Sequence, residues 1–278
     1  MLNLLLAILS SALVSILMRL SGTKIKNNFG MLSVNYLMCM VLAWGYAGFG
    51  GLFPEEQGLP LALGLGVVNG ILFLAGFVLL QVNIKKNGVV LPSTFLKLGL
   101  LVSMVVSVFF FREIPGLLQT LGFVLAVGAI ILINYQPGQA AGSKWGLILV
   151  LLAGGTADSM SKVFEELGNP ALADHFLLYT FIVALVLCVL MNIGSKKGRP
   201  GKWEWIFGLL IGIPNFFSAK FLLGALKTIP AVIVYPVCSV ATILVVTLAG
   251  ILLFKERLEK RQWVALGLIL VALVLLNI

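Results

Sequence analysis

The sequence has few charged residues, and this shortage excludes a water-soluble globular protein. Only 10% of the 278 residues are charged, whereas 60% are hydrophobic. A soluble domain carries about 25% charged residues. Because so few charges cannot cover a surface for water, we expect lipid to be the main solvent of this chain.

Histidine and cysteine are also scarce, which limits the chemistry. His175 is the only histidine, so a zinc site or a Ser-His triad is not expected. The cysteines Cys39, Cys188 and Cys238 lie in apolar runs without metal-ligand spacing, which favours buried thiols over a disulfide or a metal site. A Walker motif is missing from the sequence. We therefore predict no cofactor, no metal and no enzymatic activity.

The formal net charge of +9 could suggest a nucleic-acid partner. The basic residues, however, occur in short clusters between apolar runs rather than along one soluble face. Anionic lipid headgroups are their more natural neighbours. The sequence predicts the lipid bilayer as a partner and predicts no nucleic acid.

Long apolar runs fill most of the chain, and they are continuous rather than alternating, which favours helices over a β-barrel. The first run lacks preceding basic residues, so we expect a retained helix rather than a cleaved signal peptide. The fold class predicted is all-α integral membrane, with ten transmembrane helices. The predicted spans are 2–20, 30–50, 60–82, 88–111, 115–134, 145–166, 172–193, 203–226, 230–254 and 261–278.

One motif occurs twice, with each matching pair 143 residues apart, and this predicts two repeats, 1–138 and 139–278. The pairs are Phe111/Phe254, Arg112/Lys255, Glu113/Glu256, Gln119/Gln262 and Asn134/Asn277. Five spans per repeat is an odd number, so the second repeat must enter the membrane inverted. Inverted repeats are typical of transporters, with the substrate site near the membrane midplane. We expect the two Glu residues to form ion pairs with neighbouring Arg or Lys at the helix ends.

The two motifs resemble those of the drug/metabolite transporter superfamily, and within it the EamA-like ten-helix transporters. The resemblance covers essentially the whole chain and implies a transporter fold. The segment Leu17–Ser21 is also similar to the first helix of small multidrug transporters, whose membrane glutamate would fall near Ser11 and Gly154. The missing carboxylate there argues against their mechanism of proton-coupled drug export.

The sequence gives two conflicting predictions for the orientation of the chain in the membrane. Most of the 19 Lys and Arg residues lie in the loops after odd-numbered spans, which favours placing those loops in the cytoplasm and both termini outside. The family resemblance implies termini in the cytoplasm.

Two lysines within predicted spans are candidates for substrate binding, since an ionisable group in hydrocarbon is costly. Lys97 lies about 13 Å into the fourth span, near the midplane, with Pro92 nearby to free a backbone carbonyl. Lys220 lies in the eighth span. Together they would favour an anionic or amino-acid-like substrate, although either could instead extend to the interface.

Asp158 is the only acidic residue placed deep in a span. It is a candidate for binding a cation or a proton. The alternative is an intrahelical pair with Lys162, four residues later.

Four uncharged residues complete the candidate substrate site. Asn69 and Asn215 each follow a glycine by three residues, and Tyr36 and Tyr179 are 143 residues apart. Each could contact substrate, or could pack helices through hydrogen bonds.

The function predicted is a secondary transporter that moves a small polar metabolite across the plasma membrane as a multi-pass protein, by alternating access. A lipid or lipid-headgroup flippase or accessory subunit, and a cationic exporter using Asp158, remain alternatives. A homodimer also remains open.

Overall fold

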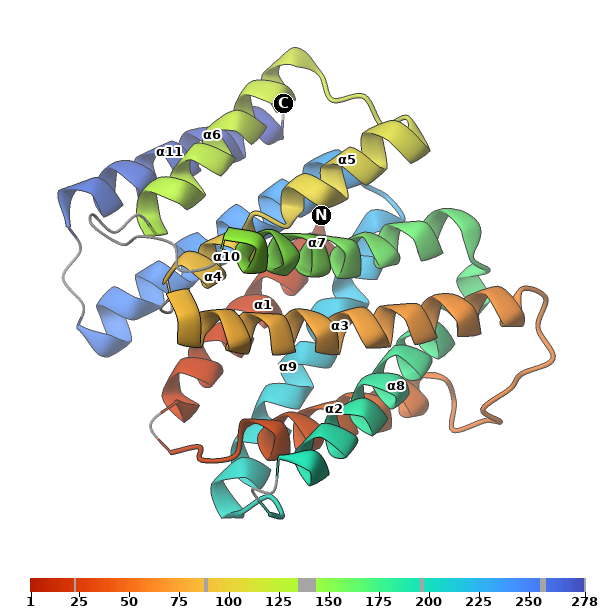
Figure 1. The fold of residues 1–278 in the computed structure, drawn as a ribbon. Coiled ribbons are helices and arrows are strands. Elements are labelled where there is room, and N and C mark those ends of the chain that lie inside the picture. The colour runs from red at the N-terminus through yellow and green to blue at the C-terminus, as the bar shows by residue number, and fades with distance from the viewer. Residues whose placement is uncertain (23, 88–89, 135–143, 196–197, 256–258, 278) are drawn as a thin grey trace. The chain divides into compact units, whose positions relative to one another are not determined.

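The computed structural model describes residues 1–22, 24–87, 90–134, 144–195, 198–255 and 259–277, and Figure 1 shows its helices. Within these residues the chain is all-helical, as predicted. The helices are α1 (Leu2–Ser21), α2 (Asn28–Tyr46), α3 (Leu59–Asn87), α4 (Val90–Lys97), α5 (Leu100–Phe111), α6 (Leu117–Asn134), α7 (Lys144–Leu167), η1 (Pro170–Leu172), α8 (Ala173–Gly194), α9 (Lys202–Leu226), α10 (Ala231–Phe254) and α11 (Lys260–Leu276).

Seven of the described helices, α1, α2, α3 and α7 to α10, are long and apolar enough to cross a membrane. Two shorter apolar segments, Phe95–Phe111 and Leu117–Ile133, cover the predicted fourth and fifth spans. The fourth span differs from the prediction, because it is two helices, α4 and α5, with a turn at Leu98 and Gly99. The chain is a membrane protein; the count of ten spans stays a prediction.

The repeated motif has the same local structure in both copies. Arg112 and Lys255 end α5 and α10 in the left-handed conformation, with φ of 56° and 54°. This conformation terminates helices, although it is costly for residues other than glycine. The side chains of Gln119 and Gln262 then accept hydrogen bonds from the backbone N–H groups of Gly116 and Glu259, at 3.0 and 2.9 Å. The motif therefore stops one helix and caps the next.

The chain divides into two compact units. Unit 1 contains residues Met1–Leu74 and Val163–Ala225, and unit 2 contains Ala75–Lys162 and Leu226–Ile278. The boundaries fall inside α3 and α7 and at the end of α9, so each unit takes helices from both predicted repeats.

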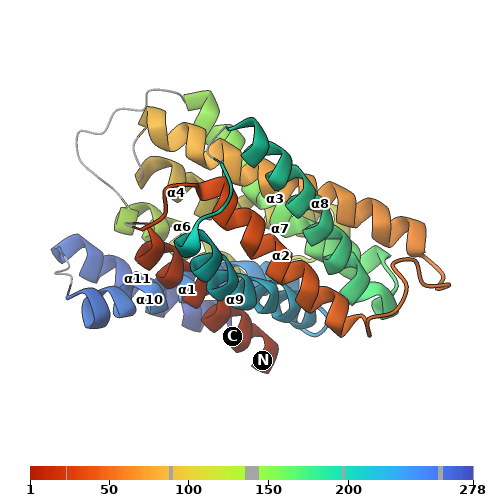
Figure 2. The ribbon, with the colours of Figure 1, turned by 90° about the horizontal axis from the view of Figure 1, so that it is seen from below.

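In unit 1, α2 and α8 pack as an antiparallel pair, visible in Figures 1 and 2. Asn27, which caps the start of α2, donates to Asn192 near the end of α8 at 2.8 Å. At the opposite ends, the Tyr179 hydroxyl donates to the carbonyl of Leu52 at 2.6 Å. These polar contacts fix the register of the two helices.

Glycines allow α3 and α9 to approach this pair closely. A Cβ atom added to Gly70 of α3 would lie 2.6 Å from the Thr180 carbonyl oxygen of α8. A Cβ added to Gly212 of α9 would lie 2.6 Å from the Met38 side chain of α2. Gly66 and Gly208, four residues earlier in each helix, are equally crowded. Small residues spaced by four are typical of close helix packing in membranes.

Unit 2 repeats the antiparallel arrangement with other helices. The helix α6 packs on α11 and α5 packs on α10. Gly122, near the start of α6, touches Leu275 and Leu276 at the end of α11. Glu113, just after α5, accepts a hydrogen bond from the backbone of Val232 at the start of α10. A core of small and branched side chains, including Ala126, Ala129, Ile130, Ile269 and Ala272, fills this unit.

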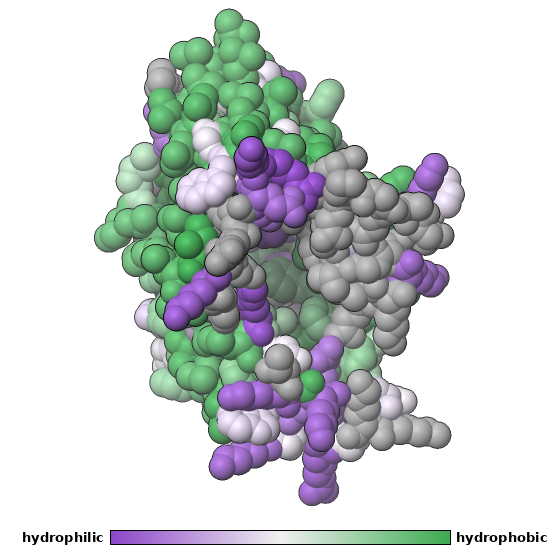
Figure 3. All heavy atoms as spheres, turned by 90° about the vertical axis from the view of Figure 1, so that its left-hand side faces the viewer, coloured by the Kyte–Doolittle hydropathy of each residue, from purple (hydrophilic) through white to green (hydrophobic). Residues whose placement is uncertain are grey.

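Large hydrophobic side chains remain exposed on both units, among them Phe110 at 78%, Leu252 at 76% and Ile193 at 69%. The face seen in Figure 3 has wide hydrophobic areas beside clusters of hydrophilic residues. Exposed patches of this kind mark surfaces that contact another apolar phase, here the lipid chains.

Candidate functional site

The break between α4 and α5, within unit 2, positions Lys97. This lysine is the last residue of α4 and is half-buried. The backbone N–H of Gly99 bonds to the carbonyl of Leu96 at 3.1 Å, so the chain turns tightly here instead of continuing as one helix. The break lies beyond Pro92, not at it. Among the described residues, none forms an ion pair with Lys97.

Two glycines of α7 pack against this break. A Cβ at Gly154 would lie 2.6 Å from the side chain of Leu96, and one at Gly155 would overlap the carbonyl oxygen of Gly99. Ser103 of α5 donates to the Gly155 carbonyl at 3.1 Å. Larger residues at 154 or 155 would push α7 away, so these glycines set the distance between α7 and Lys97.

Asp158 follows Gly154 by four residues and therefore lies on the same face of α7, about one helical turn further along. Its side chain is exposed, and no described residue pairs with its carboxylate. Its backbone carbonyl accepts a hydrogen bond from the Tyr235 hydroxyl of α10 at 2.8 Å. Lys97 and Asp158 are thus opposite charges on neighbouring helices of one unit.

Lys162 does not pair with Asp158, contrary to the alternative drawn from its spacing. Its Nζ lies 2.9 Å from the Glu113 carboxylate, and both side chains are largely buried. Glu113 also accepts the backbone N–H of Val232 at 3.1 Å. The predicted ion pair of Glu113 therefore exists, but its partner is Lys162 and not Arg112. Glu256, the second copy of this glutamate, lies outside the described residues.

Lys220, in unit 1, has a partner that the sequence did not reveal. Its Nζ lies 2.5 Å from Asp174 of α8 and 3.9 Å from the centre of the Tyr46 ring. The Asp174 charge compensates Lys220, so this lysine is not a bare cation for an anionic ligand.

Asn69 and Asn215, also in unit 1, bridge helices. Asn69 is buried and donates to the Thr180 hydroxyl at 3.3 Å, while no described residue forms a hydrogen bond with its Oδ1. Asn215 donates to the Asn35 side chain at 3.3 Å and to the Cys39 sulfur at 3.6 Å. Each links the third helix of one predicted repeat to the second helix of the other.

Tyr36 and Tyr179 are both buried in unit 1. Tyr179 uses its hydroxyl on Leu52 and stacks with Phe53, with ring centres 6.5 Å apart. The contacts of Tyr179 are those of a packing residue.

Sequence reasoning missed the glycine pairs and Asp174. The spacing of Gly66 and Gly70, and of Gly208 and Gly212, was a usable signal, since four-residue spacing of glycines is typical of close membrane packing. Asp174 gave a weaker signal, as an acid in the first turn of α8. The described residues contain no cluster of side chains that could hold a metal ion.

The comparisons with known proteins identify a family domain in the second half of the chain. The family model of the EamA-like transporters matches residues 141–278. These residues are an EamA-like domain. This domain is part of the drug/metabolite transporter superfamily and contains Asp158, Tyr179, Asn215 and Lys220, whereas Lys97, Asn69 and Tyr36 precede it.

Two curated relatives and one solved structure extend this result. An uncharacterised protein of Haemophilus influenzae is 23% identical over 95% of this chain and 93% of its own length. A probable 4-amino-4-deoxy-L-arabinose-phosphoundecaprenol flippase subunit, ArnE of Proteus mirabilis, is 28% identical over 35% of this chain and 96% of its own length. A crystal structure with 14% identity matches 99% of this chain and 94% of its own, with a TM-score of 0.77, and shares the fold.

Proposed function

We propose that this EamA protein is a secondary transporter for small amino-acid-like zwitterions. The proposal is carried by Lys97 and Asp158 of unit 2, which bear opposite charges on closely packed helices without pairing to described residues. The carboxylate of an amino acid would bind Lys97, and its ammonium group would bind Asp158. Gly154 packs against Leu96, the residue before Lys97, and Asp158 follows Gly154 by about one helical turn, which supports a shared site for the two charges.

The energetic argument favours a zwitterion over a simple anion or cation. An ionised side chain within a membrane helix is costly and is kept where it serves a pathway or a ligand. A substrate with both charges compensates both residues at once, while an anion or a cation leaves one of them uncompensated. The break after α4 supports the same reading, because transporters bind substrates at interrupted helices.

The inverted repeat is part of this proposal. It is supported by three antiparallel pairs of helices that correspond in the two predicted repeats: α2 with α8, α5 with α10, and α6 with α11. The matching helix ends at Arg112 and Lys255 support it further. Ten spans in two inverted repeats would give alternating access of a site near the midplane. We place this activity in the plasma membrane.

A ligand-stabilisation screen on the purified full-length protein tests the substrate class. Amino acids, dicarboxylates and organic cations are added separately, and the midpoint of thermal unfolding is measured. We expect amino acids to raise the midpoint for the unaltered protein and for Lys260→Gln, which removes an exposed lysine. Lys97→Gln and Asp158→Asn should each abolish the shift. Stabilisation by dicarboxylates or cations alone would contradict the proposal.

A lipid-headgroup flippase is the second candidate function, and the similarity to the ArnE flippase subunit favours it. Measuring the movement of a fluorescent phospholipid between the leaflets of proteoliposomes distinguishes the two candidate functions. A flippase accelerates this movement, whereas an amino-acid transporter leaves it at the rate of protein-free vesicles.

A further inference from the structure

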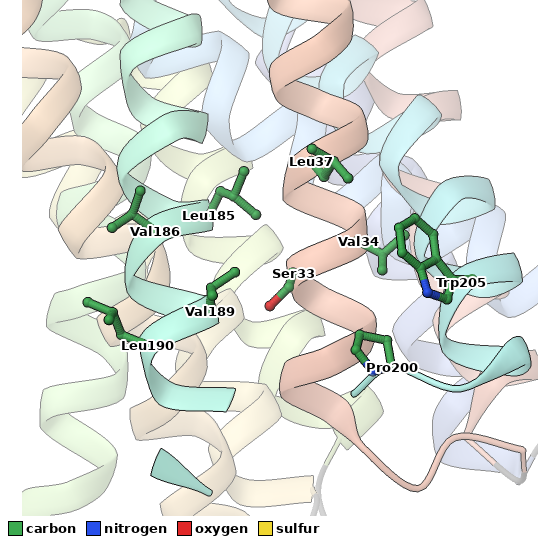
Figure 4. Close-up of a pocket in the computed structure, with 9 residues that line it drawn as sticks. All are labelled: Ser33, Val34, Leu37, Leu185, Val186, Val189, Leu190, Pro200 and Trp205. Atoms are coloured by element: carbon green, nitrogen blue, oxygen red, sulfur yellow. The ribbon is translucent and has the colours of Figure 1, made fainter. Parts of the chain in front are cut away.

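An apolar groove lies on unit 1, whereas the charged residues of the proposed transport site belong to unit 2. It has a volume of about 500 Å³ and is lined by Ser33, Val34, Leu37, Leu185, Val186, Val189, Leu190, Pro200 and Trp205. Figure 4 shows these side chains on α2, on α8 and near the start of α9, with Pro200 just before that helix. Ser33 donates its hydroxyl to the carbonyl of Phe29 at 2.8 Å, so this hydrogen is already used within α2, and most of the wall is aliphatic.

The groove opens outward rather than into a core. Val186, Val189 and Leu190 of α8 are 51%, 37% and 58% exposed, and Trp205 of α9 is 45% exposed. An open apolar groove on a membrane protein is filled by lipid chains. Tryptophan at its rim is typical of the level of the lipid headgroups.

Basic residues surround this end of unit 1. Arg199 and Lys202 are exposed and lie next to Pro200 in the chain. Lys24, from the loop before α2, places its Nζ 4.4 Å from the centre of the Trp203 ring. The acidic residue here, Glu204, is buried and accepts the backbone N–H groups of Lys26 and Asn27, both at 3.1 Å. The exposed charge beside the groove is therefore positive.

We propose that this groove is a binding site for one anionic phospholipid. An acyl chain lies along the groove, and the phosphate meets Arg199 and Lys202 at its end. Basic residues between membrane helices are known to hold anionic headgroups. The lipid is a bound component of the protein rather than its cargo, and the site is independent of Lys97 and Asp158.

Native mass spectrometry of the full chain tests this site with phosphatidylglycerol and phosphatidylcholine of identical acyl chains. Each basic residue near a headgroup gives about a fivefold preference for the anionic lipid, so two give about 25-fold. We expect one tightly held phosphatidylglycerol per chain. Arg199→Gln combined with Lys202→Gln should reduce the preference to nearly nothing, while Lys144→Gln combined with Lys260→Gln, which removes equal charge from unit 2, should preserve it.

A second set of variants tests the proposal by filling the groove with larger side chains. Leu37→Trp, on the α2 wall, and Val186→Trp, on the α8 wall, should each weaken the retention of both lipids while the protein still unfolds cooperatively. Equal retention of the two lipids by the unaltered protein would overturn the proposal. An equal loss of preference in both charge-removal variants would also overturn it. A dimer that Leu37→Trp converts to a monomer would overturn it as well, since a second chain would then occupy the groove.

Discussion

At the scale of single residues, the charged groups inside the helices divide into those that form an ion pair with a described residue and those that do not. Lys162 with Glu113 and Lys220 with Asp174 form ion pairs, whereas Lys97 and Asp158 have no such partner among the described residues. Paired charges stabilise helix contacts, and unpaired ones are available to a ligand. The local sequence could not reveal these pairs, because Glu113 and Lys162 are far apart in the chain and Asp174 belongs to a different helix from Lys220.

Breaking the buried pair of Lys162 should destabilise the protein strongly. Removing one partner leaves an uncompensated charge, which typically costs about 3–5 kcal/mol. We expect Lys162→Met to lower the free energy of unfolding by that amount in detergent, as measured by chemical denaturation. Adding Glu113→Gln should recover part of the loss, because the amide oxygen can still accept the N–H of Val232. A double variant less stable than Lys162→Met would contradict this account.

Asn69 should contribute little to stability or binding. Within the described part of the chain its side chain makes one long hydrogen bond of 3.3 Å, and its buried Oδ1 has no partner there. Hydrogen bonds between membrane helices average about 0.6 kcal/mol, and the unpaired oxygen offsets part of that. Asn69→Leu should change the free energy of unfolding by less than about 1 kcal/mol and leave amino-acid stabilisation intact. Loss of ligand binding in a folded Asn69→Leu protein would assign this residue to the site.

At the scale of helices, glycine contacts decide how closely the elements pack. The bounds of most helices were predictable from sequence within a few residues, because they follow apolar runs of about twenty residues, the length that crosses a bilayer. The break after Lys97 was missed, since Gly99 is one glycine in an otherwise continuous apolar run. A non-local contact accompanies it, because Gly154 and Gly155 of α7 pack closely against this turn.

Two glycines of α3 make a matched test of this packing. A Cβ at Gly70 would meet the Thr180 carbonyl oxygen at 2.6 Å, whereas one at Gly64 meets nothing within 4 Å. We expect Gly70→Ala to lower the free energy of unfolding by about 1–3 kcal/mol through overpacking. Gly64→Ala should be neutral or slightly stabilising, since alanine favours helix. Similar effects of both substitutions would show that the contact with α8 does not limit stability.

At the scale of the whole molecule, charge predicts orientation. The charge distribution favours the loop containing Lys24 in the cytoplasm and the loop containing Glu55 outside. A membrane-impermeant maleimide added to intact cells should label a cysteine introduced as Glu55→Cys and should not label Lys24→Cys. The natural cysteines lie within helices and provide the background. The reverse labelling would give the orientation that the family resemblance implies.

The repeat was predicted from sequence because its markers are local, and the structure gives these markers the same form at both places: a helix end at Arg112 or Lys255 and a hydrogen-bonded Gln119 or Gln262. The candidate substrate residues formed a longer set at first, because charge and depth in a span do not show which side chains form ion pairs. The contacts reduce the strongest candidates to Lys97 and Asp158.

Transport of labelled amino acids into proteoliposomes tests the central claim most directly. We predict uptake by the unaltered protein that exceeds protein-free vesicles and is inhibited by unlabelled amino acids. Lys97→Gln and Asp158→Asn should each reduce uptake about tenfold or more, because each leaves one substrate charge uncompensated. Lys260→Gln and Glu55→Gln, at exposed positions, should transport normally. Undiminished uptake in folded Lys97→Gln and Asp158→Asn proteins would contradict the account.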